Sequence, residues 1–268
     1  MEMIKILLVG DVVGESGRAV FSRNIDALMK KHSIDGLIVN GENSCQTGRG
    51  ITLKSIDIFK SAGVNIITTG NHVWQQREVY SSFMTRKDLI RPHNFPEDTP
   101  GTGIATFITK SGISVGVINL QGRVFMKELL SCPFKAADQA ISYLKNKTKL
   151  IFIDFHAETT SEKIALAHYV AGRVTGIVGT HTHVQTADDR ILLDYTAFIS
   201  DLGMVGSLNG ALGMKKEPII ENFLKQMPTK FTVDSEPPFI FCGVIITAQA
   251  NGKATSIERV MIKDTAPC

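Results

Sequence analysis

The chain has 268 residues, of which 43% are hydrophobic and 21% are charged, and its formal net charge is +3. This is the composition of a globular protein with a substantial core; the charge falls short of a strongly basic nucleic-acid binder, and four scattered cysteines without Cys-x-x-Cys spacing argue against a zinc ribbon or a disulfide framework. With neither a signal-peptide pattern nor an apolar stretch long enough to span a bilayer, we expect a soluble cytoplasmic protein with free thiols and no membrane partner.

The first third of the chain alternates strand and helix patterns. Glycine-rich residues 14–17 predict a turn before the first helix, and Gly63 is a plausible cap after the second. Strands are expected at 4–10, 36–39 and 65–69, with helices at 18–31 and around 53–59. This order predicts an α/β fold with a parallel sheet and right-handed connections.

The remainder of the chain mixes hairpins with further strand–helix pairs. A capping box at 159–162 predicts the start of one helix, and Ile220, Phe223 and Leu224 are expected to face inward from another. The expected elements are a hairpin of 103–109 and 113–119, a helix at 136–147, a strand at 150–155, a helix from the capping box to about 170, strands at 175–178 and 196–200, a helix at 218–225 and a hairpin of 239–248 and 254–262. No repeat or linker divides the chain, so we predict one domain over residues 1–268.

Five of the predicted strands are followed by side chains that can bind metals. They are Asp11, Glu42 with Asn43, Asn71 with His72, His156, and the pair His181 and His183. In α/β sheets, sites gather beyond the carboxyl ends of strands. Oxygen and imidazole ligands without thiolate suit manganese, iron or zinc, and three imidazoles argue against magnesium or calcium.

Each of these residues also has an ordinary structural interpretation. Asp11 could cap a helix, Glu42, Asn43 and Asn71 could be turn residues, and a lone histidine is more often a satisfied core residue than a ligand. Together these interpretations require several coincidences at one sheet edge, so the metal site is favoured. The chain lacks a P-loop, a dinucleotide-binding Gly-x-Gly-x-x-Gly and a Gly-x-Ser-x-Gly elbow, which leaves other nucleotide or serine-hydrolase chemistry unsupported.

These residues carry a family resemblance. In order along the chain they look like the motifs of calcineurin-like metallophosphoesterases, although Val13 stands where the wider superfamily has histidine and Glu42 where it has aspartate. Longer strings resemble the YmdB-like branch: Gly10-Asp11-Val12-Val13-Gly14, Val39-Asn40-Gly41-Glu42-Asn43, Arg91-Pro92, Asn119-Leu120-Gln121-Gly122-Arg123-Val124-Phe125-Met126, Asp154-Phe155-His156-Ala157-Glu158 and Gly179-Thr180-His181-Thr182-His183-Val184-Gln185-Thr186-Ala187-Asp188. The resemblance implies two packed mixed sheets flanked by helices, an α/β/β/α sandwich.

The resemblance also implies a dinuclear site. One metal would be held by Asp11, Glu42, Asn43 and His183, and the other by Glu42, Asn71, His156 and His181. Glu42 would bridge the two ions, iron or manganese being favoured and zinc an alternative. His72, beside Asn71, would act as the proton donor.

The implied activity is hydrolysis of cyclic nucleotides, foremost 2′,3′-cyclic nucleoside monophosphates, which RNA can supply. Two metals roughly 3.5–4 Å apart could clamp the phosphate and provide a bridging hydroxide that attacks phosphorus in line, with a general acid protonating the leaving alkoxide. Alternatives are a phosphatase or nuclease with the same core and a more open cleft, or a regulatory metal-binding protein that acts through partners.

Two loop arginines and an apolar segment leave further alternatives open. Arg49 and Arg123 are candidates to hold substrate phosphate or base, but solvated loop arginines are the slightly favoured interpretation. We expect a homo-oligomer, and the apolar segment 202–206 could form an interface as easily as core.

Overall fold

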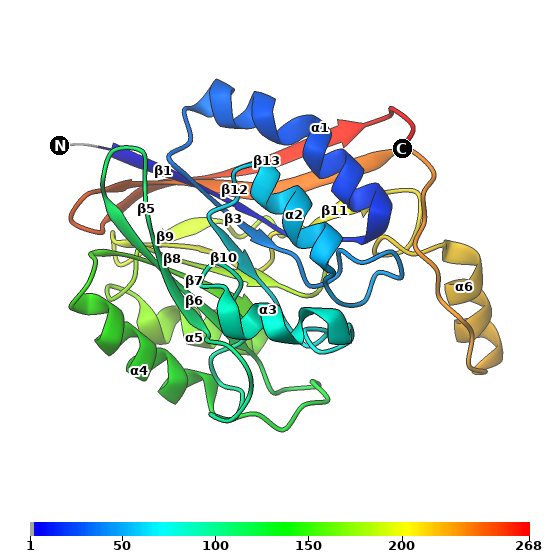
Figure 1. Cartoon of the computed structure of the whole chain (residues 1–268), viewed down its shortest axis with the longest axis horizontal. Helices are drawn as coiled ribbons and strands as arrows, with labels where there is room; N and C mark the ends of the chain where they lie inside the picture. Colours follow the sequence, from blue (N-terminus) through cyan, green and yellow to red (C-terminus); the bar gives the residue numbers. More distant parts are fainter. Residues whose placement is uncertain (1–2) are drawn as a thin grey trace.

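Two β-sheets pack face to face in the computed structural model of the chain, which describes residues 3–268 (Figure 1). The seven-stranded sheet contains β1 (Met3–Val9), β2 (Asp11–Val12), β3 (Gly36–Asn40), β4 (Ile66–Thr68), β11 (Met204–Ser207), β12 (Phe239–Gln249) and β13 (Ala254–Asp264). The six-stranded sheet contains β5 (Ile104–Ile108), β6 (Ser114–Gln121), β7 (Leu150–His156), β8 (Gly176–Thr180), β9 (Arg190–Leu192) and β10 (Thr196–Ile199).

Both sheets are mixed. In the first, β1, β3 and β4 run parallel, while the long strand β12 pairs antiparallel with β1, β11 and β13. In the second, β6, β7, β8 and β10 run parallel, with β5 and β9 antiparallel at the two edges. The predicted hairpins β5–β6 and β12–β13 and the predicted parallel β1, β3 and β4 are confirmed.

Helices cover the outer face of each sheet. In Figure 1, α1 and α2 lie over the seven-stranded sheet, and α4 and α5 lie below the six-stranded sheet. The helices are α1 (Gly14–His32), α2 (Leu53–Ser61), the 3₁₀ turn η1 (Arg77–Val79), α3 (Tyr80–Thr85), α4 (Pro133–Lys145), α5 (Thr160–Val170) and α6 (Lys216–Lys225).

The alternation of side chains along the strands divides the core into layers. In β1, Ile4, Ile6 and Leu8 lie between the sheets, whereas Leu7 and Val9 pack under the helices. A third cluster fills the space between the six-stranded sheet and α4 and α5. Because successive residues of a strand point to opposite faces, each buried apolar strand serves two layers. The predicted α/β/β/α sandwich is confirmed.

The predicted turn at residues 14–17 is wrong, because these residues form the first turn of α1. The Gly17 N–H donates to the Val13 carbonyl at 2.9 Å, as in a helix. A Cβ at Gly17 would lie 2.4 Å from the Val205 carbonyl oxygen. The glycine that suggests a turn in the sequence therefore allows the helix to approach β11 closely.

The predicted capping box is also wrong, although α5 begins where it was expected. Thr159 makes no side-chain cap bond, and its hydroxyl oxygen is buried without a hydrogen-bond partner. The Glu162 carboxylate instead accepts the backbone N–H groups of Arg123 (3.1 Å) and Val124 (3.3 Å). The carboxylate that would complete the capping box is therefore bound by a loop that is distant in sequence.

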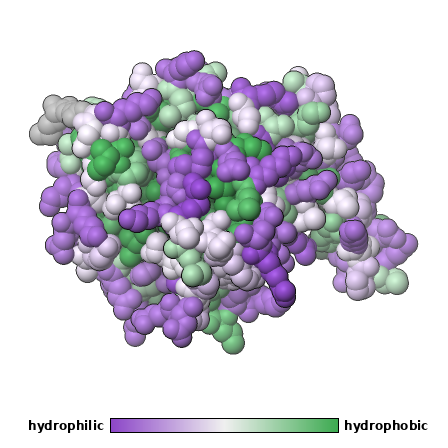
Figure 2. All heavy atoms as spheres, in the orientation of Figure 1, coloured by the Kyte–Doolittle hydropathy of each residue, from purple (hydrophilic) through white to green (hydrophobic). Residues whose placement is uncertain are grey.

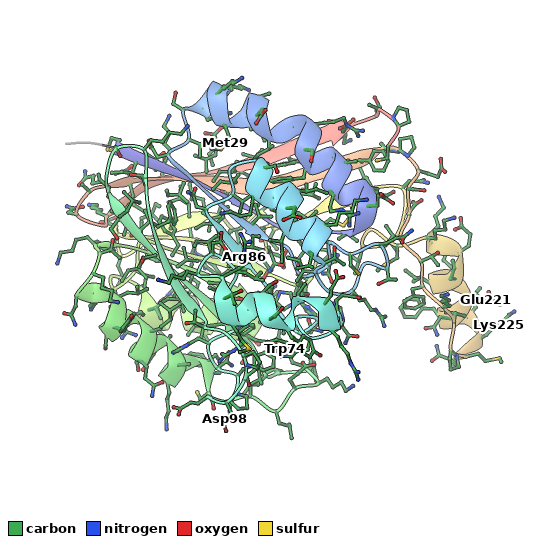
Figure 3. All side chains as sticks on the ribbon, in the orientation of Figure 1. Met29, Trp74, Arg86, Asp98, Glu221 and Lys225 are labelled. Atoms are coloured by element: carbon green, nitrogen blue, oxygen red, sulfur yellow. The ribbon has the colours of Figure 1, made fainter. Side chains whose placement is uncertain are left out.

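Helix α6 forms as predicted, but its apolar residues do not enter the core. Ile220 is 52% exposed, Phe223 72% and Leu224 79%, and no residue of this helix is buried. The helix projects from the body of the molecule in the space-filling view (Figure 2). Glu221 and Lys225, paired at 2.7 Å, lie on its side away from the body (Figure 3).

Three further findings bear on the sequence-based expectations. Segment 202–206 is largely strand β11, and its apolar side chains Leu202, Met204 and Val205 are buried, so core is the correct alternative to an interface. All four cysteines are free thiols. Within residues 3–268, no helix has both the length and the apolar character needed to cross a membrane.

Candidate metal centre

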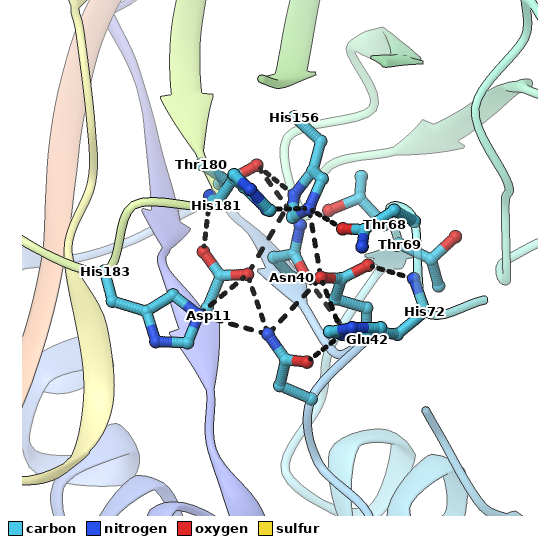
Figure 4. A network of polar contacts seen from close by, with 12 residues as sticks. Asp11, Asn40, Glu42, Thr68, Thr69, His72, His156, Thr180, His181 and His183 are labelled. Atoms are coloured by element: carbon cyan, nitrogen blue, oxygen red, sulfur yellow. Dashed lines mark hydrogen bonds and ion pairs between the residues drawn. The ribbon is translucent and has the colours of Figure 1, made fainter. Parts of the chain in front are cut away.

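The carboxyl ends of strands from both sheets meet at one buried place. Asp11 begins β2 one residue after β1, His156 is the last residue of β7, and the other side chains follow β3, β4 and β8. Here the structure brings together all seven of the residues that the sequence suggested as ligands: Asp11, Glu42, Asn43, Asn71, His156, His181 and His183. Figure 4 labels the two carboxylates and the three histidines of this set.

One half of the centre is arranged around His156. Its Nε2 atom lies 2.9 Å from Asn71 Oδ1, 3.0 Å from Glu42 Oε1 and 3.0 Å from His181 Nδ1. A single ring nitrogen cannot hydrogen-bond to all three neighbours, because it has one proton or one lone pair. Glu42, His156 and His181 each direct a ligand atom to one point, as in a cation site.

The other half is arranged around the Asn43 amide. Its Nδ2 atom lies 3.1 Å from His183 Nε2, 3.4 Å from Asp11 Oδ1 and 3.3 Å from Glu42 Oε1. The same Glu42 oxygen therefore borders both halves. This is the place that a bridging carboxylate would occupy.

Burial determines the charge state of these groups. Asp11, Glu42 and His156 are fully buried. Desolvation lowers the pKa of His156 to about 4, and desolvation with the neighbouring His156 lowers the pKa of His181 to about 4. Both imidazoles are therefore neutral at physiological pH, which is the form that binds metals. Burial also raises the pKa of Asp11, because its charge is poorly solvated, although the neighbouring His183 and His156 oppose this effect.

Hydrogen bonds outside the centre hold the His156 ring in one tautomer. Its Nδ1 lies 3.0 Å from the Thr180 hydroxyl oxygen, and that hydroxyl donates to Asp154 at 2.7 Å. Because the Thr180 hydroxyl donates its proton to Asp154, its oxygen can only accept a hydrogen bond from His156, and the donor is the Nδ1–H. Asp154 also accepts from Asn40 and Thr68, and burial raises its pKa to about 7. The Nε2 lone pair of His156 thus faces the centre.

The other two histidines are held in the same way. His181 Nε2 lies 2.9 Å from a carboxylate oxygen of Glu158, so this nitrogen carries the proton and Nδ1 faces the centre. His183 Nδ1 lies 3.1 Å from the Leu212 carbonyl oxygen, so its proton is there and Nε2 faces the centre. All three imidazoles direct a bare nitrogen inward, as metal-binding histidines do. The donor set fits metal ions.

The loop that carries two of the histidines has an unusual backbone. His181 and His183 have positive φ values of 98° and 64°. Between them, the Thr182 N–H and hydroxyl both donate to Asp201 Oδ2, at 3.1 and 2.6 Å, and Lys163 Nζ donates to the same oxygen at 2.8 Å. Lys163 and Asp201 are both buried. This buried ion pair anchors the loop, since backbone in the left-handed region needs support from its surroundings.

His72 lies beside the centre and faces solvent. Its Nδ1 is 2.8 Å from Asn43 Oδ1, and its backbone N–H donates to Glu42 Oε2 at 3.1 Å. Desolvation lowers its pKa, with Glu42 opposing the effect. Its side chain is 26% exposed and borders a cavity of about 560 Å³. His72 can therefore contact a molecule bound in the cavity, because the candidate metal-binding residues do not enclose it.

Of the two candidate arginines, only Arg49 lines the cavity. Arg49 lines it together with Glu42, His72 and His183. Arg123 is exposed in the loop held by Glu162, and in the described part of the chain it does not line this cavity. A substrate role remains open for Arg49 only, and the interpretation of Arg123 as a solvated loop residue is favoured.

Sequence reasoning assigned no role to the outer partners Asp154, Glu158, Lys163, Thr180 and Asp201. One signal was available, because Asp154 interrupts an apolar strand two residues before His156 and must share its face. The pairing of Lys163 with Asp201 spans 38 residues and left no such signal.

Comparison with known proteins gives close relatives. The chain is 45% identical, over 97% of its length and 98% of the relative, to the 2′,3′-cyclic-nucleotide 2′-phosphodiesterase of Bacillus subtilis. It is 38% identical, over 94% of its length and 87% of the relative, to a putative phosphatase/phosphodiesterase of Mycoplasma pneumoniae. A crystal structure described as a novel phosphatase of Mycoplasma pneumoniae superposes with a TM-score of 0.91 at 36% identity, covering 99% of this chain and 95% of that one.

The sandwich fold, the centre at its shared edge and these relatives define a class: the phosphoric ester hydrolases of metallophosphoesterase type. Residues 7–260 match the family model described as YmdB-like protein. The chain belongs to the YmdB-like family.

Proposed function

We propose that this protein is a phosphodiesterase that depends on two metal ions and hydrolyses cyclic nucleotides, 2′,3′-cyclic nucleoside monophosphates above all. The observation that carries the proposal is the set of three histidines whose ring protons are all held on the outer side, with bare nitrogens beside two buried carboxylates. The Bacillus subtilis relative, which bears the name of this activity, supports the choice of substrate.

The two halves of the centre would each hold one ion. His156, His181 and Asn71 would bind the first, and the second would be bound by Asp11, Asn43 and His183. Glu42, whose Oε1 borders both halves, would bind both. Iron or manganese suits this oxygen and imidazole set, with zinc as an alternative. Elemental analysis of protein purified without added metal tests both the number and the identity of the ions.

The Asn43 amide links the centre to His72. Its nitrogen faces the ligands and its oxygen faces His72 Nδ1, but a 180° turn exchanges the two atoms in place. With the oxygen turned to the centre as a ligand, Nδ2 donates to His72 Nδ1, and the His72 ring is neutral with its one proton on Nε2. Proton donation requires the imidazolium ion, whose Nδ1–H the Asn43 oxygen accepts in the orientation of this structure.

The bound metals would supply positive charge that draws in the phosphate and acidifies water. His72, at the cavity border, would act in its imidazolium form, giving its Nε2 proton to the leaving alkoxide oxygen of the opened ring and becoming the neutral imidazole. Arg49, which lines the same cavity, would bind a phosphate oxygen. A cavity of about 560 Å³ suits a mononucleotide.

A substrate panel tests the proposal. Purified protein with added Mn²⁺ is given 2′,3′-cyclic AMP, 3′,5′-cyclic AMP, p-nitrophenyl phosphate, its bis ester and RNA. We expect the highest kcat/KM with 2′,3′-cyclic AMP, and no turnover after metal removal by a chelator. Faster hydrolysis of p-nitrophenyl phosphate would instead favour a phosphatase, the second candidate, which the names of the Mycoplasma relatives support. Inactivity across the panel with metals bound would indicate a regulatory protein.

We also propose that residues 1–268 form one domain and that the protein is a homo-oligomer in the cytoplasm. Strands from both ends of the chain share one sheet, which supports a single domain. Phe125 and Leu129 are 88% and 99% exposed, a degree expected of interface residues. The free thiols suit a reducing compartment. Light scattering measures the oligomeric state, and a monomer would contradict that part of the proposal.

A further inference from the structure

The cavity beside the metal centre has two walls of different chemistry. One wall consists of centre residues, including Glu42, His72 and His181. The other wall consists mainly of apolar side chains from α6 and nearby loops, together with Asn222: the apolar ones are Leu212, Met214, Ile219, Phe223 and Phe231. The proposed chemistry at phosphorus makes no use of this second wall. A molecule held by its phosphate at the centre must nevertheless lie against it.

Helix α6 directs two of its apolar residues to the cavity. Ile219 and Phe223 are four residues apart, so they occupy the same face of the helix, and both line the cavity. The Glu221–Lys225 ion pair occupies the side away from the body (Figure 3). No residue of α6 is buried, so the fold gains little from the position of this helix. Its position is better explained by what it presents to the cavity.

Phe223 provides a flat apolar surface that is not covered by the protein. It is 72% exposed although it lines the cavity. Exposed aromatic side chains that border polar sites stack on nucleobases, and such stacking tolerates any base because every base has a π-face. Arg49 lines the same cavity and places a positive charge near His72. The cavity thus joins a place for an anion to a place for a planar ring.

We propose that Phe223, with Ile219 beside it, forms the nucleobase subsite of this enzyme and selects nucleoside phosphates over phosphate esters without a base. The inference rests on the proposed phosphodiesterase function and deepens it. Phe223 acts by binding, and it exchanges no proton or bond with the substrate. Since stacking contacts all bases alike, the subsite distinguishes substrates with a base from those without one.

The test compares two substrates that have the same five-membered cyclic phosphate: 2′,3′-cyclic AMP, and glycerol 1,2-cyclic phosphate, which has no base. For the Phe223→Ala variant, we expect the ratio of kcat/KM for the nucleotide to kcat/KM for the glycerol compound to fall roughly tenfold, mainly through KM. Phe223→Trp should keep the ratio within a fewfold of wild type. The matched control is Leu224→Ala, which removes an exposed apolar side chain from the next position of the same helix, outside the cavity wall, and should leave both substrates unaffected.

The outcomes separate this inference from the proposed function. If wild type hydrolyses neither cyclic phosphate with metals bound, the proposed function fails. If wild type hydrolyses both and Phe223→Ala leaves the ratio unchanged, the nucleobase subsite is refuted. A variant that loses both activities equally also refutes it, provided that the thermal unfolding of the variant matches that of wild type. Misfolding is not expected, since Phe223 is largely exposed.

Discussion

Replacement of Lys163 by methionine tests how the two-histidine loop is held. The change removes the ammonium group that lies 2.8 Å from Asp201 and keeps a side chain of similar length. Both partners are only 1% exposed, so Asp201 would remain as a buried charge without its cation. Breaking a buried pair in this way costs about 3–5 kcal/mol. Asp201 retains hydrogen bonds from Thr182 and the Gly203 N–H, which favours the lower end of that range.

We therefore expect Lys163→Met to unfold roughly 10 °C below wild type in a thermal scan, because about 3 kcal/mol corresponds to that shift in a chain of this size. The matched control is Lys225→Met, which makes the same chemical change to a pair at 2.7 Å whose side chains are 61% and 51% exposed. An exposed pair contributes less than about 1 kcal/mol, so this control should unfold close to wild type.

The double variant Lys163→Met with Asp201→Asn separates charge from packing. It removes both charges, so it should recover most of the lost stability. If Lys163→Met unfolds at the same temperature as Lys225→Met, the buried pair does not stabilise the loop and the reasoning fails. A second measurement follows Mn²⁺ affinity by titration. We expect a loss of roughly 10- to 100-fold, because the loop between the two histidines loses the hydrogen bonds from Lys163 to Thr182 and Asp201.

The remaining predictions concern the centre and the core. His72→Ala should keep its metals by elemental analysis while turnover falls by roughly a hundredfold or more, the scale of a lost general acid, and an unchanged rate would contradict that role. Asp11→Ala and His183→Ala should each lower the metal content, and full occupancy would refute the ligand set. A chelator should lower the melting temperature and added Mn²⁺ should restore it, by about 2.7 kcal/mol at a hundredfold excess over Kd, whereas an unchanged melting temperature would mean that the folded state holds no metal. Phe59→Ala, which empties a fully buried position against Phe21, should cost about 3–5 kcal/mol in urea unfolding, and a cost below about 1 kcal/mol would contradict close packing there.

The strands and the edge where the candidate site lies could be predicted from the sequence because both depend on local pattern. Apolar runs such as residues 4–9 predict buried strands, and a polar residue directly after such a run, like Asp11, must lie at the edge of the sheet. Parallel strands bring those edges together. Local pattern therefore sufficed to place residues as far apart as Asp11 and His181 in one cluster, where the His181 N–H donates to Asp11 at 3.1 Å.

The features that sequence reasoning missed depend on contacts between distant residues. Asp154 accepts from Asn40, 114 residues away, and from Thr68, 86 residues away, and no local spacing reveals such pairs. Glu162 has the spacing of a capping box but binds a loop 39 residues upstream. In α6 the periodicity predicts the helix but the wrong inward face. The expected face was Ile220, Phe223 and Leu224 toward a core, whereas Ile219 and Phe223 line an open cavity.

The candidate ligands come from both sheets, and this explains why the centre is buried and why it depends on how the two sheets pack. Asp11, Glu42 and the two asparagines come from the seven-stranded sheet, and all three histidines come from the six-stranded sheet. Neither sheet alone supplies both the carboxylates and the imidazole nitrogens that the proposed ions would require. The centre therefore exists only while the inter-sheet layer, with residues such as Ile6 and Phe152, holds the two edges in register. Helix α6 lies outside this arrangement, so the wall that we assign to the nucleobase can vary in sequence without disturbing the metals.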